Sequence, residues 1–292
     1  KAGLIERYFS LMPEGGTCVP YRLDSVGRGR IMTVPVHIGG NVRDFVFDTG
    51  AAQFNFVSER FARENGIRMI ADSIPVAGIG RGWVGLGVAD SLAVGGIVMR
   101  NPVFLISPPD QATDTIEVIS AVLGNAFMRK AERFTIDNRT RHIVFPAERT
   151  LHADGTKRMA NMMLNSFQPY VRIHADGIPL LFHFDTGNVA TTLYPPYYEL
   201  FREQVDSCGV EDTVRIGGFA GVAENVCYRL PSVEFTLEGV PFTLRDIDVL
   251  PSGSAGATAG SEAGSLGTDF ATAFDTLTVD YTSCTVLGEN VP

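Results

Sequence analysis

The chain has 292 residues, 45% hydrophobic and 20% charged, a normal balance for a globular protein long enough to form two lobes. Its formal net charge of −9 argues against nucleic-acid or anionic-membrane partners, because both need a basic face. No apolar run approaches the roughly 20 residues that a membrane-spanning helix requires, so no transmembrane segment is expected.

The first half of the chain predicts a mostly β unit. Residues 45–50, FVFDTG, form a short apolar strand that runs into a tight turn, where Gly50 supplies the permissive backbone. Ser58 follows as a helix cap, so a short helix is expected over SERFAREN. The glycine-rich stretch at 78–82 and the alternating residues after it then predict a hairpin.

The second half repeats these elements in the same order. Residues 182–187 read FHFDTG, and Pro195-Pro196 opens a helix after the aspartate, as Ser58 does in the first half. Another glycine-rich stretch, 216–221, then predicts a second hairpin. The segment 150–168 lies between the two sets of elements and is expected to connect them.

The repeat extends well beyond the two Asp-Thr-Gly triplets. The first triplet is followed by LGNAF at 123–127 and the second by LGTDF at 266–270, at nearly equal distances along the chain. Each of these is followed in turn by Thr-Ile-Asp or Thr-Val-Asp. We therefore expect two copies of one unit of roughly 145 residues, an N-terminal lobe at 1–149 and a C-terminal lobe at 150–292.

Two carboxylates in matching turns carry a specific chemistry if the copies pack about a two-fold axis. Asp48 and Asp185 would then face each other closely enough to share one proton over a wide pH range. One would act as a general base on a water molecule, and the other, protonated, would donate to a carbonyl oxygen. Thr49 and Thr186 would each send a hydroxyl to the backbone of the opposite turn. This is peptide-bond hydrolysis that requires no metal and no cofactor.

These motifs resemble those of the aspartic peptidases. FVFDTGA and FHFDTGN are each followed by a glycine-rich hairpin and then by Leu-Gly-x-x-Phe, and the resemblance covers residues 30 to 288. It implies the bilobal acid-protease fold, mostly β, with two pseudo-two-fold-related β-barrel-like lobes and short helices. It also implies that 122–124 and 265–267 thread beneath the catalytic turns. Two triplets in one chain are typical of pepsin-like members, whereas the compact units are typical of retropepsin-like members, which normally dimerise. The chain therefore resembles a fused, single-chain retropepsin-like dimer of the kind that bacterial genomes encode.

The resemblance implies an aspartic endopeptidase that acts on peptide or protein substrates with Asp48 and Asp185 as its catalytic dyad. The residues expected to support this dyad are Thr49, Gly50, Ala51, Thr186, Gly187 and Asn188. The residues expected on flaps over the substrate cleft are Gly78, Ile79, Gly80, Trp83, Gly217, Gly218 and Phe219.

The residues after the two triplets depart from the pepsin-like pattern, in which a Ser or Thr there hydrogen-bonds the catalytic carboxylate. Ala51 removes that donor on one side, whereas the side-chain amide of Asn188 can supply one to Asp185. Without this hydrogen-bond donor, the ionised carboxylate is less stable. We therefore expect the dyad to lose its proton at a higher pH than in strongly acid-adapted relatives. The predicted pH optimum is mildly acidic.

The sequence also allows three alternatives to a peptidase to be compared with it. A catalytically inactive peptide-binding or scaffolding protein could keep the same fold, although both triplets are intact here. A glycosidase would need two acids about 5–10 Å apart on unlike elements, which identical turns do not suggest. GRGWVG at 80–85 matches a dinucleotide motif, but the glycine-broken alternation after it predicts no helix and hence no nucleotide cofactor.

Several residues are expected to have structural roles. Asp137 and Asp280 repeat at strand ends, where aspartates commonly form turns. His183 is expected to point away from the core and to bind no ligand. The four cysteines allow three disulfide connectivities or four unpaired thiols. The phenylalanines expected in the core by their strand spacing are Phe45, Phe47, Phe182 and Phe184.

Two expectations concern the state of the whole molecule. Because both halves of the dyad lie in one chain, a monomer with two fused lobes is expected to suffice. The start at Lys1 and the absence of any cytosolic cofactor motif favour an extracytoplasmic location, whether periplasmic, secreted or lipid-anchored.

Overall fold

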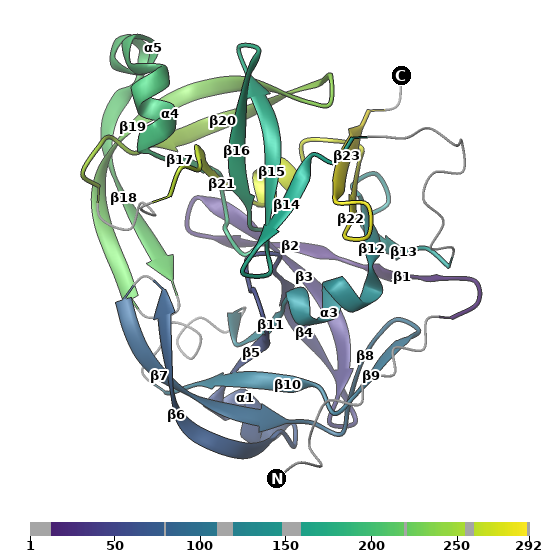
Figure 1. The fold of residues 1–292 in the computed structure, drawn as a ribbon. Helices are drawn as coiled ribbons and strands as arrows, with labels where there is room; N and C mark the ends of the chain where they lie inside the picture. Colours follow the sequence, from purple (N-terminus) through teal and green to yellow (C-terminus); the bar gives the residue numbers. More distant parts are fainter. Residues whose placement is uncertain are drawn as a thin grey trace.

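The computed structural model describes residues 13–78, 80–109, 119–147, 159–218, 221–254 and 260–290. It consists of three β-sheets with short helices at their edges (Figure 1). The predicted mostly β, bilobal acid-protease fold is confirmed. Within the described part of the chain, no helix has both the length and the apolar character that crossing a bilayer requires.

The first sheet belongs to the first half of the chain. Its strands are β2 (Arg22–Val26), β3 (Gly29–Ile38), β4 (Asn41–Phe47), β5 (Asn55–Ser58), β6 (Arg68–Gly78), β7 (Gly80–Val88), β8 (Ser91–Val94), β9 (Ile97–Arg100), β10 (Val103–Ser107) and β11 (Ala121–Leu123). They lie in the order β6-β7-β10-β5-β11-β4-β3-β8-β9, and β2 pairs with β3. The central strand β11 runs parallel to β4 and antiparallel to β5.

The second sheet belongs to the second half of the chain. Its strands are β14 (Met162–Asn165), β15 (Gln168–Ala175), β16 (Ile178–Phe184), β17 (Thr192–Leu193), β18 (Val210–Gly218), β19 (Gly221–Leu237), β20 (Val240–Val249) and β21 (Gly264–Leu266). Strand β21 runs parallel to β16 and antiparallel to β17, which repeats the arrangement of β11 in the first sheet. The internal duplication read from the sequence is therefore also a duplication of strand topology.

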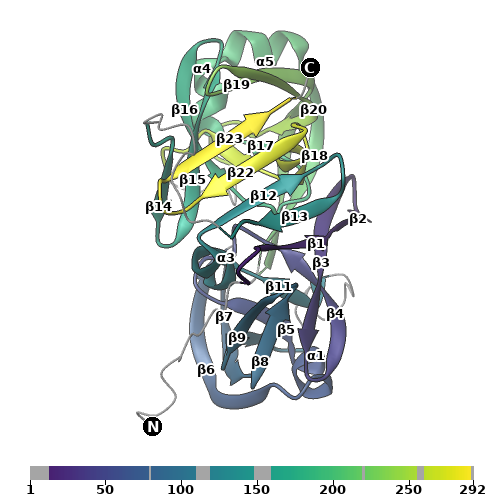
Figure 2. The same cartoon turned by 90° about the vertical axis from the view of Figure 1, so that its right-hand side faces the viewer.

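The third sheet is shared by the two halves, and Figure 2 shows it between the lobes. Its strands are β1 (Thr17–Pro20), β12 (Arg133–Asp137), β13 (His142–Phe145), β22 (Thr276–Asp280) and β23 (Thr285–Glu289). Strand β12 of the first half pairs antiparallel with β22 of the second, and Thr135 lies directly opposite Thr278. The Arg133 guanidinium also donates to the Asp280 carboxylate at 2.9 Å. The two lobes are thus joined by backbone pairing as well as by side chains.

Five short helices complete the described part of the chain. They are α1 (Glu59–Glu64), α3 (Asn125–Ala131), α4 (Pro195–Leu200), α5 (Arg202–Cys208) and α6 (Thr268–Ala271). Ser58 caps α1 by accepting the backbone N–H of Phe61 at 3.1 Å, and α4 begins at Pro195. The two predicted helix starts are confirmed.

The four phenylalanines assigned to the core are fully buried. Phe47 packs edge-on against Phe134 with ring centroids 5.0 Å apart, and Phe184 packs in the same way against Phe270 at 5.3 Å. Each strand that carries an Asp-Thr-Gly turn is thereby anchored through aromatic packing that stabilises its position.

The predicted connection between the lobes needs a correction. Residues 162–165, which we placed in the connection 150–168, form strand β14 and pair with β15. Met162 is 5% exposed, so this strand contributes to the core of the second lobe. Residues 148–158, with the predicted boundary after residue 149, lie outside the described residues, and that boundary stays a prediction.

Candidate active site

The two Asp-Thr-Gly turns lie against each other where the lobes meet. Strand β4 leads into Asp48 and strand β16 into Asp185. The backbone N–H of Asp48 donates to the Leu123 carbonyl at 3.0 Å, and that of Asp185 donates to the Leu266 carbonyl at 2.9 Å. The segments 122–124 and 265–267 therefore lie directly beside the two turns.

The two threonines tie the turns together. The Thr49 hydroxyl accepts the Thr186 backbone N–H at 3.0 Å, and the Thr186 hydroxyl accepts the Thr49 backbone N–H at 3.0 Å. The same hydroxyls donate to the carbonyl oxygens of Phe184 at 2.8 Å and Phe47 at 2.5 Å. Because both threonines are fully buried, these four hydrogen bonds are shielded from water and hold the turns in register.

The two glycines set the separation of the turns. A Cβ atom added at Gly50 would lie 2.2 Å from Oδ1 of Asp185, and one added at Gly187 would lie 2.5 Å from Cγ of Asp48. Each aspartate carboxyl thus rests over the glycine of the opposite turn. No other residue type has room at either position, so the side-chain-free backbone is a condition of the carboxyl pairing.

Each of the two carboxyl groups affects the ionisation of the other. Burial first, and then the charge and the carboxyl of Asp185, raise the pKa of Asp48 well above its usual range. Burial also raises the pKa of Asp185. A pair of this kind holds one proton jointly over a wide pH range. The Asp185 side chain is 25% exposed, so the pair can be reached from the solvent.

Backbone donors complete the environment of the pair. Oδ1 of Asp48 accepts the N–H groups of Gly50 at 2.7 Å and Ala51 at 3.0 Å, and Oδ1 of Asp185 accepts that of Gly187 at 3.0 Å. The backbone N–H of Asn188 donates to the main-chain oxygen of Asp185. Among the hydrogen bonds of the described residues, none joins the Asn188 side-chain amide to Asp185, so the donor expected there is not in place.

Two hairpins occupy equivalent places in the two lobes, and Figure 1 shows both on the same side of the molecule. Gly78 pairs with Gly80 across the tip of β6–β7, and Gly217 and Gly218 pair with residues of β19 near the tip of β18–β19. Trp83 lies on β7 with 62% of its surface exposed. Ile79 and Phe219, which were expected at the tips, lie outside the described residues.

His183 is a neighbour of the dyad that the sequence analysis missed. It points away from the core, as expected, but Nδ1 lies 4.0 Å from Oδ2 of Asp185 and its side chain is only 14% exposed. The available signal was its position two residues before Asp185, because side chains two apart on a strand share a face.

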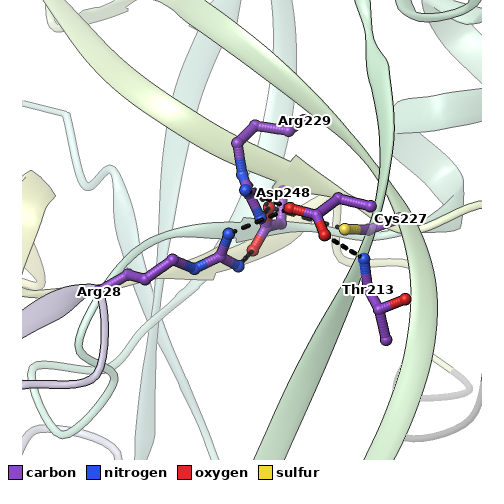
Figure 3. A network of polar contacts seen from close by, with 6 residues as sticks. Arg28, Thr213, Cys227, Arg229 and Asp248 are labelled. Carbon is purple, nitrogen blue, oxygen red and sulfur yellow. Dashed lines mark hydrogen bonds and ion pairs between the residues drawn. The ribbon is translucent and has the colours of Figure 1, made fainter.

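A second unforeseen feature is an ionic contact between the lobes, shown in Figure 3. Arg28, in the turn between β2 and β3, donates to the Asp248 carboxylate at 2.9 Å and lies 3.4 Å from that of Asp212. Arg229 donates to Asp248 at 2.8 Å and also pairs with Asp212. The thiol of buried Cys227 donates to Asp248 at 3.6 Å.

Backbone contacts next to Arg28 join the same turn of the first lobe to the chain that follows Asp185. The N–H of Arg30 donates to the carbonyl oxygen of Val189 at 3.2 Å. Gly29 lies against the same carbonyl, since a Cβ added there would be 2.4 Å from the Val189 oxygen. The β2–β3 turn of the first lobe is therefore held against the chain just after the second Asp-Thr-Gly turn.

Metal-ligating groups and disulfides are both absent from the part of the chain that the structure describes. Within the described ranges, no group of three or more His, Cys, Asp or Glu side chains is placed to hold a metal ion. All four cysteines are free thiols, which is the unpaired alternative of the two considered.

Comparison with known proteins agrees with this geometry. Residues 34–127 match the family model described as aspartyl protease. This match covers about a third of the chain, and these residues are similar to the aspartyl proteases. The matched range contains Asp48, whereas Asp185 lies in the second copy, which the internal repeat and the fold relate to the first.

Two solved structures share this fold over most of their length. The aspartic proteinase from Irpex lacteus is 12% identical, covers 94% of this chain and 98% of its own, and has a TM-score of 0.56. Basic 7S globulin from soybean is 11% identical, covers 94% of each chain, and has a TM-score of 0.54. Among curated proteins, none matches the chain. At these identities the likeness shows the bilobal acid-protease fold alone.

Proposed function

We propose that this protein is an aspartic endopeptidase of a single-chain, retropepsin-like type that hydrolyses peptide bonds with the dyad Asp48 and Asp185. The observation that carries the proposal is the reciprocal placement of each carboxyl over the glycine of the opposite turn. The raised pKa values of the two carboxyls, each of which affects the other, support a shared proton. Shared-proton carboxyl pairs are suited to activating water without a metal.

The proposed reaction divides the work between the two members of the dyad. The ionised carboxylate takes a proton from a water molecule as its oxygen attacks the scissile carbonyl carbon. The protonated carboxyl gives its proton to the carbonyl oxygen, which would otherwise carry a negative charge. The tetrahedral diol then collapses, the C–N bond breaks, and the leaving nitrogen receives a proton from the dyad. The threonine cross-bonds keep both carboxyls oriented through these steps.

The substrate in this proposal is an extended segment of a peptide or protein lying between the lobes. The β6–β7 and β18–β19 hairpins would bind its backbone, with Trp83 exposed for contact. Because one chain contains both aspartates, a monomer would suffice, and we retain residues 1–149 and 150–292 as the two lobes. An extracytoplasmic location is retained as a prediction, to be tested by cell fractionation.

The proposed activity can be tested by incubating a diverse peptide mixture with the protein across pH 3 to 7. We expect cleavage with a mildly acidic optimum, and loss of cleavage in Asp48→Asn and Asp185→Asn. Asp44→Asn is the matched control, because Asp44 lies on the strand that leads into Asp48 but is exposed and pairs with Arg22. The proposal fails if the wild type cleaves nothing, or if the two dyad variants cleave as well as the control.

The alternative is a non-catalytic peptide-binding or scaffolding protein. One structural neighbour is named a proteinase and the other a globulin, so the fold alone does not decide between these functions. Binding of a peptide mixture without cleavage, unchanged in Asp48→Asn, would favour this alternative.

A further inference from the structure

The two copies of the unit differ sharply beside their aspartates. In the first lobe, Val46 lies two residues before Asp48 in an apolar cluster with Ile31, Ala51 and Val122. In the second lobe, polar side chains stand in the matching places. They are His183 in place of Val46, and Ser265, which pairs with His183, in place of Val122, which pairs with Val46.

The imidazole of His183 is oriented by its surroundings. Its ring lies 5.2 Å from that of Tyr170 on the neighbouring strand, and Nδ1 lies 4.0 Å from Oδ2 of Asp185. Nε2 is buried and has no hydrogen-bond partner. A buried N–H without an acceptor is costly, so the neutral ring is more stable with its proton on Nδ1. That tautomer places the N–H on the ring nitrogen that lies 4.0 Å from Oδ2 of Asp185, close enough for its dipole to act on the carboxyl.

The groups around this imidazole are acidic or neutral. Asp185 directly after β16, Asp48 directly after β4 and Glu262 before β21 contribute carboxyls, and Tyr170 on β15 contributes a phenol. Burial nevertheless lowers the pKa of His183, against the opposing influence of the Asp48 and Glu262 carboxyls. The imidazole is therefore neutral at neutral pH, and a positive charge appears beside the dyad only in acid.

We propose that His183 is a positioning residue that makes Asp185 the ionised member of the dyad and leaves the shared proton on Asp48. This inference rests on the proposed function, since it assigns the two roles within that reaction. The Nδ1–H dipole, and in acid the full imidazolium charge, stabilise a carboxylate at Asp185. The strongly raised pKa of Asp48 is consistent with its being the proton carrier. Asp185 then activates water, and Asp48 protonates the carbonyl oxygen.

The assignment predicts the acid side of the pH profile. Replacing His183 with the residue of the other copy, His183→Val, removes the stabilisation of the Asp185 carboxylate, so this aspartate becomes protonated at a higher pH. We expect the acid limb of kcat/KM to move up by about half a pH unit, which lowers kcat/KM about threefold on that limb. The control is His174→Val, because His174 lies on strand β15 of the same sheet, opposite Pro179 and four residues along the strand from the Tyr170 that faces His183. Superimposable profiles for the wild type and His183→Val would overturn the inference.

A second measurement does not depend on turnover. The aspartate side-chain carbons can be followed by NMR as the pH is raised, and we expect Asp185 to ionise before Asp48 in the wild type. In His183→Val the difference between the pKa values of Asp185 and Asp48 should become smaller, or the order of ionisation should reverse. His183→Gln serves in its place if the valine variant does not fold. Ionisation of Asp48 first in the wild type would refute the assignment. If no peptide is cleaved but Asp185 ionises first, the proposed function fails and the inference stands.

Discussion

Thr49 and Thr186 each accept the other's backbone N–H at 3.0 Å, so the two turns hold each other through a reciprocal pair of hydrogen bonds. Loss of either hydroxyl leaves one N–H and one carbonyl oxygen buried without a partner. We expect Thr49→Ala and Thr186→Ala each to destabilise the fold by about 1–3 kcal/mol. The looser dyad should also cost roughly 100-fold in kcat.

The matched controls are Thr49→Ser and Thr186→Ser, which retain the hydroxyls. Urea unfolding and peptide-cleavage kinetics would measure both effects. Equal losses in the serine and alanine variants would mean that methyl packing, rather than the hydrogen bonds, holds the turns.

Gly50→Ala should abolish activity, although it adds only one methyl group. The new methyl group would collide with Oδ1 of Asp185 at 2.2 Å and push the two carboxyls apart. Gly15→Ala is the control, because a Cβ there meets no atom within 4 Å. Cleavage assays should show loss for the first variant and wild-type rates for the second. An active Gly50→Ala enzyme would mean that the turns are not held at this separation in solution.

Asp48→Asn should stabilise the protein at neutral pH while removing its activity. The folded state retains the Asp48 proton to a higher pH than the unfolded chain does, because its pKa is raised on folding. Stability is therefore lost as the pH rises from the unfolded pKa of about 3.9 toward the folded value. The uncharged amide avoids this loss, and we expect a gain in Tm of about 2–4 °C at pH 7.

The same comparison at pH 3 should show little difference, since the carboxyl is protonated in both states there. Calorimetry at the two pH values tests the sign. A gain of equal size at both would attribute the effect to something other than the Asp48 proton.

Arg28→Ala should weaken the contact between the lobes. Asp248 is 12% exposed in its side chain, and Arg28 supplies one of the two guanidinium groups that neutralise it. We expect a loss of about 1 kcal/mol in stability, since Arg28 itself is partly exposed, and a smaller loss in 1 M salt. Burial raises the pKa of Asp248 while Arg28 opposes this, so the loss should also shrink as acid neutralises Asp248.

The control for this variant is Arg22→Ala, which removes an exposed ion pair with Asp44 inside the first lobe. It should leave the stability close to that of the wild type. If Arg28→Ala does the same, the contact contributes nothing to the arrangement of the lobes.

The cysteine thiols should differ in how fast they react with a labelling reagent. Cys18 and Cys208 are exposed, whereas Cys227 is fully buried. Burial, followed by the charge of Asp248, raises the pKa of Cys227 to about 12, so its thiolate is scarce. In a thiol-labelling experiment followed by mass spectrometry, Cys18 and Cys208 should react first. Cys227 should react only after denaturant is added, and rapid labelling of Cys227 in the native protein would contradict its burial.

Much of the site was predictable because the duplication was visible in the sequence. Two copies of one motif imply a two-fold axis, and that axis alone places Asp48 near Asp185 and Thr49 near Thr186. The helix start at Ser58 followed from a local hydrogen bond, which local sequence encodes directly.

The features that escaped prediction break the repeat or join distant parts of the chain. Strand alternation predicted that His183 points away from the core and binds no ligand, but the face opposite the core lies beside the dyad. Arg28 lies in an ordinary turn, and nothing in its neighbourhood indicates a carboxylate in the other lobe. Such contacts depend on how the two copies dock, which composition and periodicity do not specify. For His183, a direct comparison of the copies, Val46 against His183, was a second signal in the sequence beside its position two residues before Asp185.

The pairing of β12 with β22 places Thr135 opposite Thr278, with their hydroxyl oxygens 2.8 Å apart. Strand β12 thus pairs with the equivalent strand of the second copy, β22. If the two halves were made separately, each would therefore have an unpaired strand edge that is complementary to the other half. The protein should therefore tolerate being split between its repeats, with the two polypeptides reassembling into one working particle.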